Sequence, residues 1–251
     1  MIEIIPAIMP KSYEDLVEKT GLFSGLVPMI QLDIMDGKFV KGRTWPHMKK
    51  SEKLKVKSPN FAKATLGTEK LRNGDAHFEA IVKEGDGMPN WDTLDFEVDL
   101  MINDPELWVP KWVIAGARRI IVHQESIKSL KNFEIIREAI PGEIIELGIA
   151  INTRTSISIL ANYRGQIDFV QCMGIAHIGL QGETLDEKVF DQIQEVRKMF
   201  QETPISVDGG VNYENAKQLV AAGATRLVSG SVILESDDTV NAIKRFQDLV
   251  V

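Results

Sequence analysis

Near its N-terminus the chain reads Met29-Ile30-Gln31-Leu32-Asp33-Ile34-Met35-Asp36-Gly37, a short apolar run that carries a carboxylate near its end. A second run of this kind, Ile205-Ser206-Val207-Asp208-Gly209-Gly210, lies far along the chain. Short apolar runs that end in turn residues are typical of buried parallel strands. Because the carboxyl ends of the strands in a parallel barrel face one pocket, we expect Asp33 and Asp208 to meet across it.

Further apolar runs alternate with amphipathic segments over the whole length of 251 residues. The pattern predicts eight strands, over residues 3–8, 29–35, 95–102, 119–123, 144–151, 168–173, 205–208 and 226–229. Residues 184–200 and 212–222 have helical spacing, and Ser12-Tyr13-Glu14-Asp15 resembles a capping box before the first helix. Eight βα units favour the α/β class and a (β/α)8 TIM barrel, with residues 1–251 as a single domain. A doubly wound open sheet is the alternative.

One connection, between the second and third strands, is much longer than such connections usually are. We expect an insertion at about residues 41–90. Its basic part, 41–72, holds ten Lys or Arg and two acids, for a net charge of +8. Alternation over 53–57, turn residues at 58–60 and a return strand over 61–66 predict a hairpin. The lysines either protect a solvated edge from aggregation, or form a cationic lid over an anionic substrate, or contact a partner subunit.

Composition and charge limit the class of protein. A net charge of −7 argues against nucleic acid as the main partner. Cys172 is the single cysteine, which excludes a disulfide framework and a cysteine-rich metal cluster. No apolar stretch approaches the roughly 20 residues that cross a bilayer, and the first residues read as a strand and not as a signal peptide. We therefore expect a cytoplasmic protein without a membrane partner.

Five motifs, in chain order, resemble those of ribulose-phosphate 3-epimerases. They are Leu32-Asp33-Ile34-Met35-Asp36-Gly37-Lys38-Phe39-Val40, Phe96-Glu97-Val98-Asp99-Leu100-Met101, Val122-His123-Gln124-Glu125, Ser206-Val207-Asp208-Gly209-Gly210-Val211, and Ala222-Gly223-Ala224 through Ser229-Gly230-Ser231. The resemblance covers nearly the whole chain except the basic insertion. It implies an isomerase that epimerises a small ketose phosphate at the carbon next to the ketone, with a small phosphorylated sugar as its partner.

The resemblance assigns the catalytic roles to the two strand-end aspartates. One of Asp33 and Asp208 would remove the proton next to the ketone, and the other would return a proton on the opposite face. Each would need a pKa raised toward neutrality. Methionine sulfurs line the enediolate in the family, and Met35 and Met101 match two such positions. The third falls near Cys172, which keeps a polarizable sulfur.

Glycines that follow the last two strands predict a phosphate site. Barrels commonly bind phosphate on backbone N–H groups of these loops, and glycine lets the backbone approach an anion closely. Four residues suit this role: Gly209, Gly210, Gly230 and Ser231. The loop after the sixth strand retains Gly179 of the family's Asn-Pro-Gly-Phe-Gly-Gly pattern without the Asn-Pro. His177 in this loop is either an anion contact or an ordinary exposed residue.

The family binds a divalent cation with two histidines and two aspartates. The resemblance places these ligands at four positions of this chain: Gln31, Asp33, Asp99 and Asp208. Carboxylate and amide oxygens suit Mg²⁺ or Mn²⁺ better than Zn²⁺. Crowded carboxylates without a cation should take up at least one proton. The sequence therefore leaves two possibilities open: one bound divalent cation, or an acid cluster without a metal. We expect His123 to be a buried supporting residue.

Three functions stay open at this point. The first is epimerisation by the two aspartates. The second is a phosphosugar aldolase or decarboxylase of the same barrel group, which would want a lysine near the acids of the second and third strands. The third is a non-catalytic, degenerate phosphometabolite-binding barrel, favoured by the missing histidines and by Ala7 where the family has a serine. Self-association into a homo-oligomer also stays open.

Overall fold

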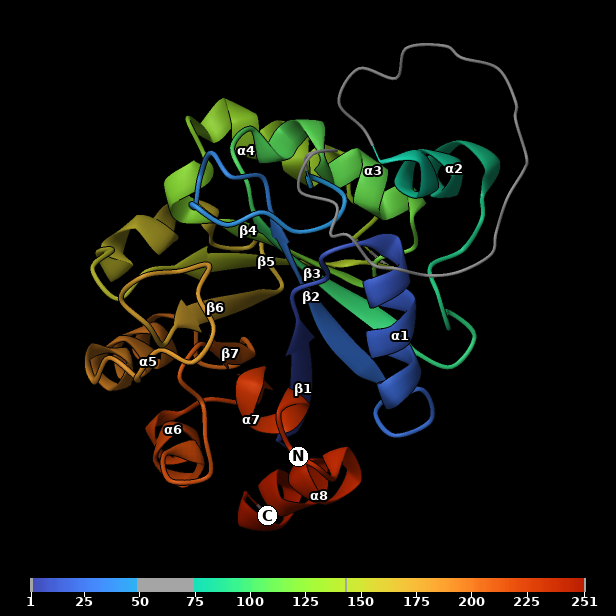
Figure 1. The fold of residues 1–251 in the computed structure, drawn as a ribbon. Coiled ribbons are helices and arrows are strands. Elements are labelled where there is room, and N and C mark those ends of the chain that lie inside the picture. The colour runs from blue at the N-terminus through green and yellow to red at the C-terminus, as the bar shows by residue number, and fades with distance from the viewer. Residues whose placement is uncertain (1, 49–74, 143, 251) are drawn as a thin grey trace.

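Eight parallel strands close into a barrel in the order β1 to β8, with helices on the outside (Figure 1). The structure, a computed structural model, describes residues 2–48, 75–142 and 144–250. Each strand pairs with the next one, and β8 pairs with β1 through residues such as Ile4 and Leu227. The predicted (β/α)8 TIM barrel is confirmed. The doubly wound alternative is wrong, because the β8–β1 pairing closes the sheet.

The strands follow the apolar runs of the sequence closely. Their bounds are Glu3–Ile8 (β1), Met29–Met35 (β2), Asp95–Met101 (β3), Arg119–His123 (β4), Glu146–Ile151 (β5), Phe169–Met173 (β6), Ile205–Asp208 (β7) and Arg226–Ser229 (β8). Three bounds differ from the prediction by one or two residues: β3 ends earlier, and β5 and β6 begin later. The differences lie at strand ends, where apolar residues of the flanking turns extend the periodic pattern.

The helices alternate with the strands and form the outer layer. Their bounds are Tyr13–Phe23 (α1), Ala76–Glu84 (α2), Val109–Ile114 (α3), Leu130–Glu138 (α4), Lys188–Met199 (α5), Ala216–Ala222 (α6), Ser231–Leu234 (α7) and Thr239–Leu249 (α8). Short 3₁₀ segments cover Pro105–Leu107, Gln124–Ser126 and Ile157–Tyr163. The predicted cap of the first helix is present, because the Ser12 hydroxyl accepts a hydrogen bond from the Asp15 backbone N–H.

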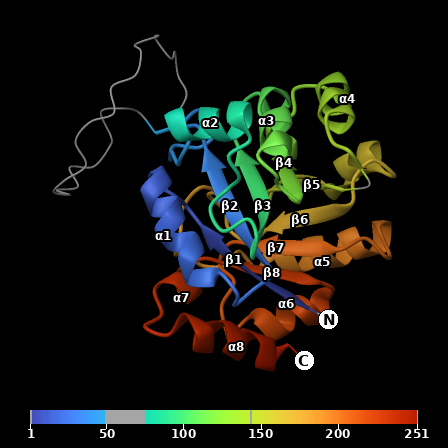
Figure 2. The same cartoon turned by 90° about the vertical axis from the view of Figure 1, so that its right-hand side faces the viewer.

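The two faces of each strand bury different side chains. On β2, Ile30 and Leu32 belong to the large apolar core between barrel and helices, while Gln31 and Asp33 are buried inside the barrel. Alternation of this kind follows from the two-residue repeat of a strand. The side view in Figure 2 shows the helices wrapped around the strands, with α7 and α8 beside β1. The barrel interior is therefore the place where polar residues can gather.

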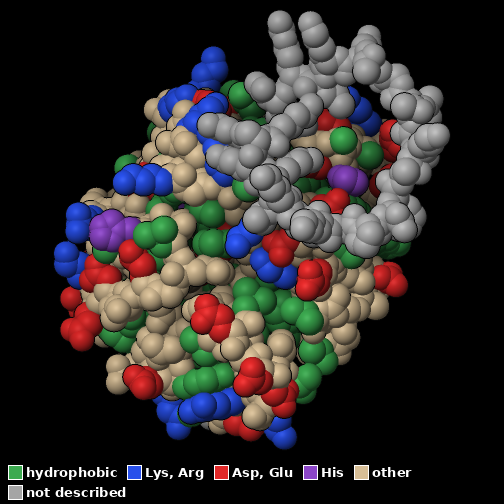
Figure 3. Space-filling view, in the orientation of Figure 1, with side chains coloured by type: hydrophobic (Ala, Val, Ile, Leu, Met, Phe, Trp, Pro, Cys, Tyr) green, Lys and Arg blue, Asp and Glu red, His purple; other side chains and the backbone are tan. Residues whose placement is uncertain are grey.

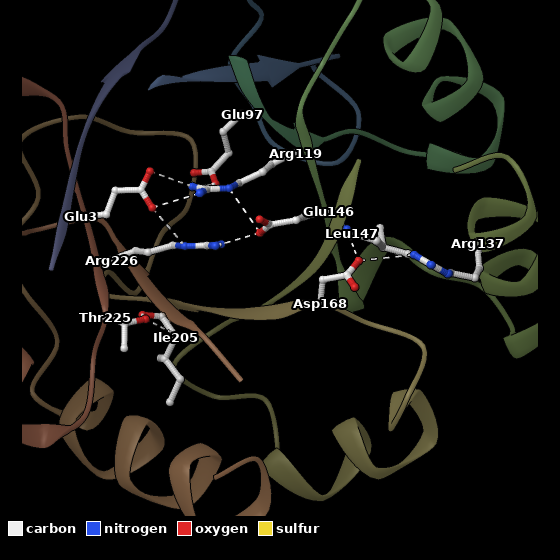
Figure 4. Close-up of polar contacts among 10 residues, drawn as sticks. All are labelled: Glu3, Glu97, Arg119, Arg137, Glu146, Leu147, Asp168, Ile205, Thr225 and Arg226. Atoms are coloured by element: carbon white, nitrogen blue, oxygen red, sulfur yellow. Dashed lines mark hydrogen bonds and ion pairs between the residues drawn. The ribbon is translucent and has the colours of Figure 1, made fainter. Parts of the chain in front are cut away.

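A network of charged side chains fills the amino end of the barrel (Figure 4). Arg119 lies between Glu3, at 3.0 Å, and Glu97, at 3.4 Å. Arg226 lies 3.3 Å from Glu3 and 2.8 Å from Glu146. Three carboxylates thus face two guanidinium groups, and the network becomes neutral when one carboxyl holds a proton. Burial raises the pKa of Glu97 to about 7, although Arg119 and Arg226 act against this shift.

The raised pKa of Glu97 predicts a pH dependence of stability. A carboxyl whose pKa is higher in the folded than in the unfolded protein stabilises the fold below its unfolded pKa, and this contribution is lost as the pH rises through 7. We expect the free energy of unfolding to fall between pH 5 and pH 8 by about 2–3 kcal/mol more in the original protein than in Glu97→Gln. Urea titrations of both proteins across this range measure the difference; parallel pH curves would contradict the prediction.

Gly148 on β5 makes room for an aromatic ring inside the barrel. A Cβ atom at this position would lie 2.4 Å from the Phe169 ring, which is fully buried. We expect Gly148→Ala to reduce the free energy of unfolding by about 1–3 kcal/mol, because the ring must move within a packed interior. Thermal or urea unfolding measures this loss. Gly21→Ala in α1 serves as a control for glycine replacement without a steric contact, because the built Cβ meets no atom within 4 Å.

The connection between β2 and β3 is described only in part. Its first residues pack onto the barrel: Trp45 is buried and makes an edge contact with the Phe78 ring of α2 at 5.4 Å. The Asp36 carboxylate holds the same turn by accepting hydrogen bonds from the backbone of Lys38 and Phe39. The predicted hairpin over 53–66 lies outside the described residues. Among the described helices, none has the length and apolar character that a membrane crossing needs.

Candidate functional site

Three buried aspartates gather toward the carboxyl ends of β2, β3 and β7. Asp33 and Asp99 are register partners on β2 and β3, and Asp208 is the last residue of β7. One carboxylate oxygen from each lies within 4.8 Å of the other two. The structure therefore brings together the two aspartates expected to face each other, with Asp99 as a third carboxylate beside them.

Gln31 connects two of these aspartates. Its side-chain Nε2 donates a hydrogen bond to Asp33 Oδ1 at 2.8 Å and another to Asp208 Oδ2 at 2.9 Å. The side chain is fully buried. Its Oε1 has no hydrogen-bond partner within the described part of the chain. The sequence had suggested an oxygen ligand at this position, whereas the structure turns the nitrogen toward the carboxylates.

Asp99 has its own donors. His123 Nε2 lies 2.9 Å from Asp99 Oδ1, and Gln171 Nε2 donates to Asp99 Oδ2 at 3.1 Å. Both donors are fully buried. The expectation that His123 is a buried supporting residue agrees with this position. Gln171 was not expected from the sequence, because a lone glutamine within an apolar strand carries no signal for a contact across the barrel.

The environment of the acids favours protonation. Burial, reinforced by the carboxylates of Asp208 and Asp99, raises the pKa of Asp33 well above its ordinary range. Burial and Asp99 raise the pKa of Asp208 to about 7, although Gln31 and His123 act in the opposite direction. Burial alone would lower the pKa of His123, but the neighbouring Asp99 carboxylate raises it. Both shifts disfavour the state in which Asp33 and Asp208 are ionised together.

A cavity of about 270 Å³ opens directly above the aspartates. Asp33 and Asp208 lie in its wall, together with Met101 and all of the glycines expected to bind phosphate. The residues from the predicted set that line it are Asp33, Met101, Gly179, Asp208, Gly209, Gly210, Gly230 and Ser231. Met35 packs behind this wall against Met101 and Val40. Eight of the predicted site residues thus line one cavity, whereas Met35, which was predicted to line the enediolate, lies behind the wall.

The loops after β7 and β8 form the part of the cavity suited to an anion. Gly209 and Gly210 have φ values of +97° and +70°, a region that favours glycine. A Cβ on Gly210 would also lie 2.7 Å from the Leu185 backbone. Gly230 precedes Ser231, the first residue of α7. N–H groups in the first turn of a helix have no partner within the helix and point outward, as a phosphate requires.

The sulfur-lined wall differs from the prediction at one residue. Cys172 is buried in the core between barrel and helices and has no contact with the cavity. The next residue, Met173, lines the cavity instead, and Met9 from the segment after β1 adds a further sulfur. The prediction for Cys172 was wrong because a shift of one position along a strand moves a side chain to the opposite face.

The loop after β6 covers one side of the cavity with residues that the sequence did not single out. Gln181 and Thr184 line the cavity, and the Gln181 Nε2 lies 2.9 Å from the point that a Cβ on Gly230 would occupy. His177 is largely exposed and pairs with Glu183 at 3.3 Å. It thus behaves as an ordinary loop histidine. The sequence carries no signal that Gln181 lines the cavity, because this position follows only from its closeness to Gly230 in the folded chain.

The donor set around the acid cluster fits a hard divalent cation. Asp33, Asp99 and Asp208 present oxygens within 4.8 Å of one another, and ligands on opposite sides of Mg²⁺ are about 4.2 Å apart. The fourth candidate, Gln31, has a buried Oε1 with no partner in the described residues. A small inward movement and a turn of this carboxamide would give four oxygen ligands, a set that suits Mg²⁺ or Mn²⁺.

The closed barrel, with a cavity at the carboxyl ends of its strands, defines an α/β barrel whose site suits a small phosphorylated molecule. The sequence model of the Ribulose-phosphate 3 epimerase family matches residues 79–234, more than half of the chain. The ribulose-phosphate 3-epimerase of Bacillus subtilis (strain 168) is 28% identical, with 98% of this chain and 99% of that protein covered. The chain belongs to the ribulose-phosphate 3-epimerase family.

A second relative and two solved structures are also similar to this chain. The chloroplastic ribulose-5-phosphate-3-epimerase of Arabidopsis thaliana is 29% identical over 97% of this chain and 75% of its own length. Among solved structures, KGPDC from Streptococcus mutans has a TM-score of 0.65 at 12% identity, with 99% and 97% of the two chains covered. A 3-hexulose-6-phosphate synthase has a TM-score of 0.64 at 17% identity over both whole chains. These structural likenesses show the shared fold.

Proposed function

We propose that the protein is a sugar-phosphate isomerase that epimerises ribulose 5-phosphate, or a related small ketose phosphate, at the carbon next to the ketone. The observation that carries the proposal is the pair Asp33 and Asp208. Both line one cavity, and one carboxamide bridges them. Family membership supports a phosphorylated sugar as the substrate. In this proposal the phosphate lies against the glycine turns after β7 and β8.

The chemistry follows from the two carboxyl groups. One aspartate, as carboxylate, removes the proton next to the ketone, and the electron pair moves to form an enediolate. The other aspartate, which holds a proton, returns it to the same carbon from the opposite face. The raised pKa values of Asp33 and Asp208 suit this division of roles at neutral pH. Methionine side chains in the wall exclude water from the reactive carbon.

A divalent cation would be held by Asp33, Asp99, Asp208 and Gln31. When bound, it would polarise the oxygens of the ketone and the enediolate. The chain's own residues still orient the carboxylates: Gln171 and His123 hold Asp99, and Gln31 holds the other two. Mg²⁺ or Mn²⁺ suits this oxygen set better than Zn²⁺.

The residues that line the cavity and the net charge of the chain weigh against the alternative functions. No lysine lines the cavity among the described residues, whereas an aldolase or decarboxylase of this barrel group would want one near the acids. Acidic and basic side chains are interspersed across the face in Figure 3, and the net charge is −7. Both features favour a small-molecule substrate over nucleic acid. A non-catalytic binding role differs from the proposal in one respect: no proton would leave the sugar.

The proposal is tested by ¹H NMR of ribulose 5-phosphate incubated with the purified protein. The incubation is run without added cation and with Mg²⁺ or Mn²⁺. We expect the epimer at the carbon next to the ketone to appear. Binding of the sugar phosphate without a new epimer, and without exchange of that proton with solvent under any of these conditions, would identify a non-catalytic barrel and overturn the proposal.

A further inference from the structure

Gln31 occupies the position between the two proposed catalytic carboxylates. Its Nε2 lies 2.8 Å from Asp33 and 2.9 Å from Asp208, so that one NH₂ group serves both. Each of its two N–H bonds can donate to one carboxylate. The N–H groups therefore point into the space that a cation shared by Asp33 and Asp208 would occupy. A cation and these N–H groups cannot face the same carboxylate oxygens together.

The other atom of the carboxamide is poised for the opposite arrangement. Oε1 is buried and lacks a hydrogen-bond partner among the described residues. The carboxamide is planar, with nitrogen and oxygen of nearly equal size, so a half turn about its last bond exchanges the two without moving neighbouring side chains. After this turn, Oε1 would face two carboxyl groups, and three converging oxygens are favourable when a cation or a carboxyl proton lies between them.

Asp99 does not take part in this exchange. His123 and Gln171 donate to its two oxygens and keep the carboxylate oriented in either arrangement. Each oxygen retains a lone pair for a cation, because a carboxylate offers about four acceptor sites. The cluster therefore contains one carboxylate with a fixed orientation, that of Asp99. The other two, those of Asp33 and Asp208, face Gln31, which can present either a donor or an acceptor to them.

We propose that Gln31 is a two-position residue that couples the catalytic carboxylates to a divalent cation: its nitrogen bridges Asp33 and Asp208 in one position, and its oxygen ligates the cation in the other. The inference rests on the proposed cation site, not on turnover. Since a ligand favours the arrangement to which it binds better, Mg²⁺ or Mn²⁺ should shift Gln31 to the oxygen-inward position.

The first test measures cation binding without substrate. Mn²⁺ is titrated into the whole protein and followed by electron paramagnetic resonance, with Gln31→Met and Gln31→Glu as variants. We expect Gln31→Met to weaken binding by at least about tenfold, since it removes an oxygen ligand, and Gln31→Glu to strengthen it by a similar factor. Equal affinity of Gln31→Met and the original protein, or the absence of Mn²⁺ binding by the original protein, would overturn the inference.

The second test observes the carboxamide itself. The side-chain NH₂ signals of Gln31 are assigned in a ¹⁵N-labelled protein by their loss in Gln31→Met, and those of Gln171 by their loss in Gln171→Met. Saturation with diamagnetic Mg²⁺ should shift the Gln31 signals strongly, because both N–H groups lose their acceptors, and should leave the Gln171 signals nearly unchanged. Unchanged Gln31 signals would contradict the proposal. Neither test requires epimerase activity, so the inference and the proposed function fail separately.

Discussion

Asp208→Asn is expected to lower the rate of epimerisation by at least about 10³-fold, because the loss of one proton-transferring group typically costs 10²–10⁴-fold. The amide keeps the size of the side chain and can accept a hydrogen bond from Gln31, which lies 2.9 Å from the original carboxylate. The fold should therefore survive. Steady-state kinetics with ribulose 5-phosphate, and circular dichroism as a check on folding, measure both expectations.

The variant should also separate the two halves of the reaction. In Asp208→Asn, Asp33 can still remove the proton that faces it and return one from the same side. That epimer should exchange its proton with solvent without being converted. Asp33→Asn should show the same behaviour with the opposite epimer. Exchange of the same epimer by both variants would contradict the two-base assignment.

A control separates these effects from a general effect of replacing aspartate by asparagine. Asp95 begins β3 at the amino end of the barrel, where it pairs with Arg118 at 3.3 Å on the surface. Asp95→Asn should leave the epimerisation rate within about twofold of the original, because surface ion pairs contribute little. An equal loss of activity in this variant would show that the effect of Asp208→Asn does not report on proton transfer.

Arg119→Met is expected to reduce the free energy of unfolding by about 3–5 kcal/mol, since it leaves the buried Glu97 carboxylate without its ion-pair partner. Arg119 lies 3.0 Å from Glu3, 3.4 Å from Glu97 and 3.3 Å from Glu146. Glu97 is fully buried, so water cannot replace the guanidinium group. Urea unfolding at neutral pH measures the loss.

A second substitution distinguishes an unpaired charge from a loss of packing. Combined with Glu97→Gln, the Arg119→Met change should cost clearly less than it does alone, because the buried carboxylate has been removed as well. If the double variant is as unstable as the sum of the two single variants, the charges do not interact. A single Arg119→Met variant within about 1 kcal/mol of the original protein would contradict the account of this network.

Much of the barrel could be predicted from the sequence because its strands are continuous apolar runs. Strands β1, β2, β4, β7 and β8 have the expected bounds. The meeting of Asp33 and Asp208 was also predictable, since closure of a parallel barrel brings the carboxyl ends of its strands together whatever their distance along the chain. The sequence does not predict correctly which side chains of a strand line the cavity, because a shift of one position moves a side chain to the opposite face. Met173 lines the cavity, whereas Cys172 lies in the core between barrel and helices.

The contacts around the acids depend on three-dimensional neighbours that no spacing encodes. Gln171 reaches Asp99 across the barrel at 3.1 Å, although the two residues are far apart in the chain. The direction of the Gln31 carboxamide depends on whether a carboxylate or a cation faces it. These details decide how the proposed chemistry differs from that of a site with two histidine ligands.

The measurement that tests the two-base account most directly is the deuterium content of the product formed from ribulose 5-phosphate in D₂O within a single turnover. The acid that returns the proton holds deuterium in this solvent. We therefore predict about one deuterium per product molecule at the carbon next to the ketone, and almost none in the recovered substrate. Product that retains the original hydrogen at this carbon would contradict proton abstraction by one aspartate and return by the other.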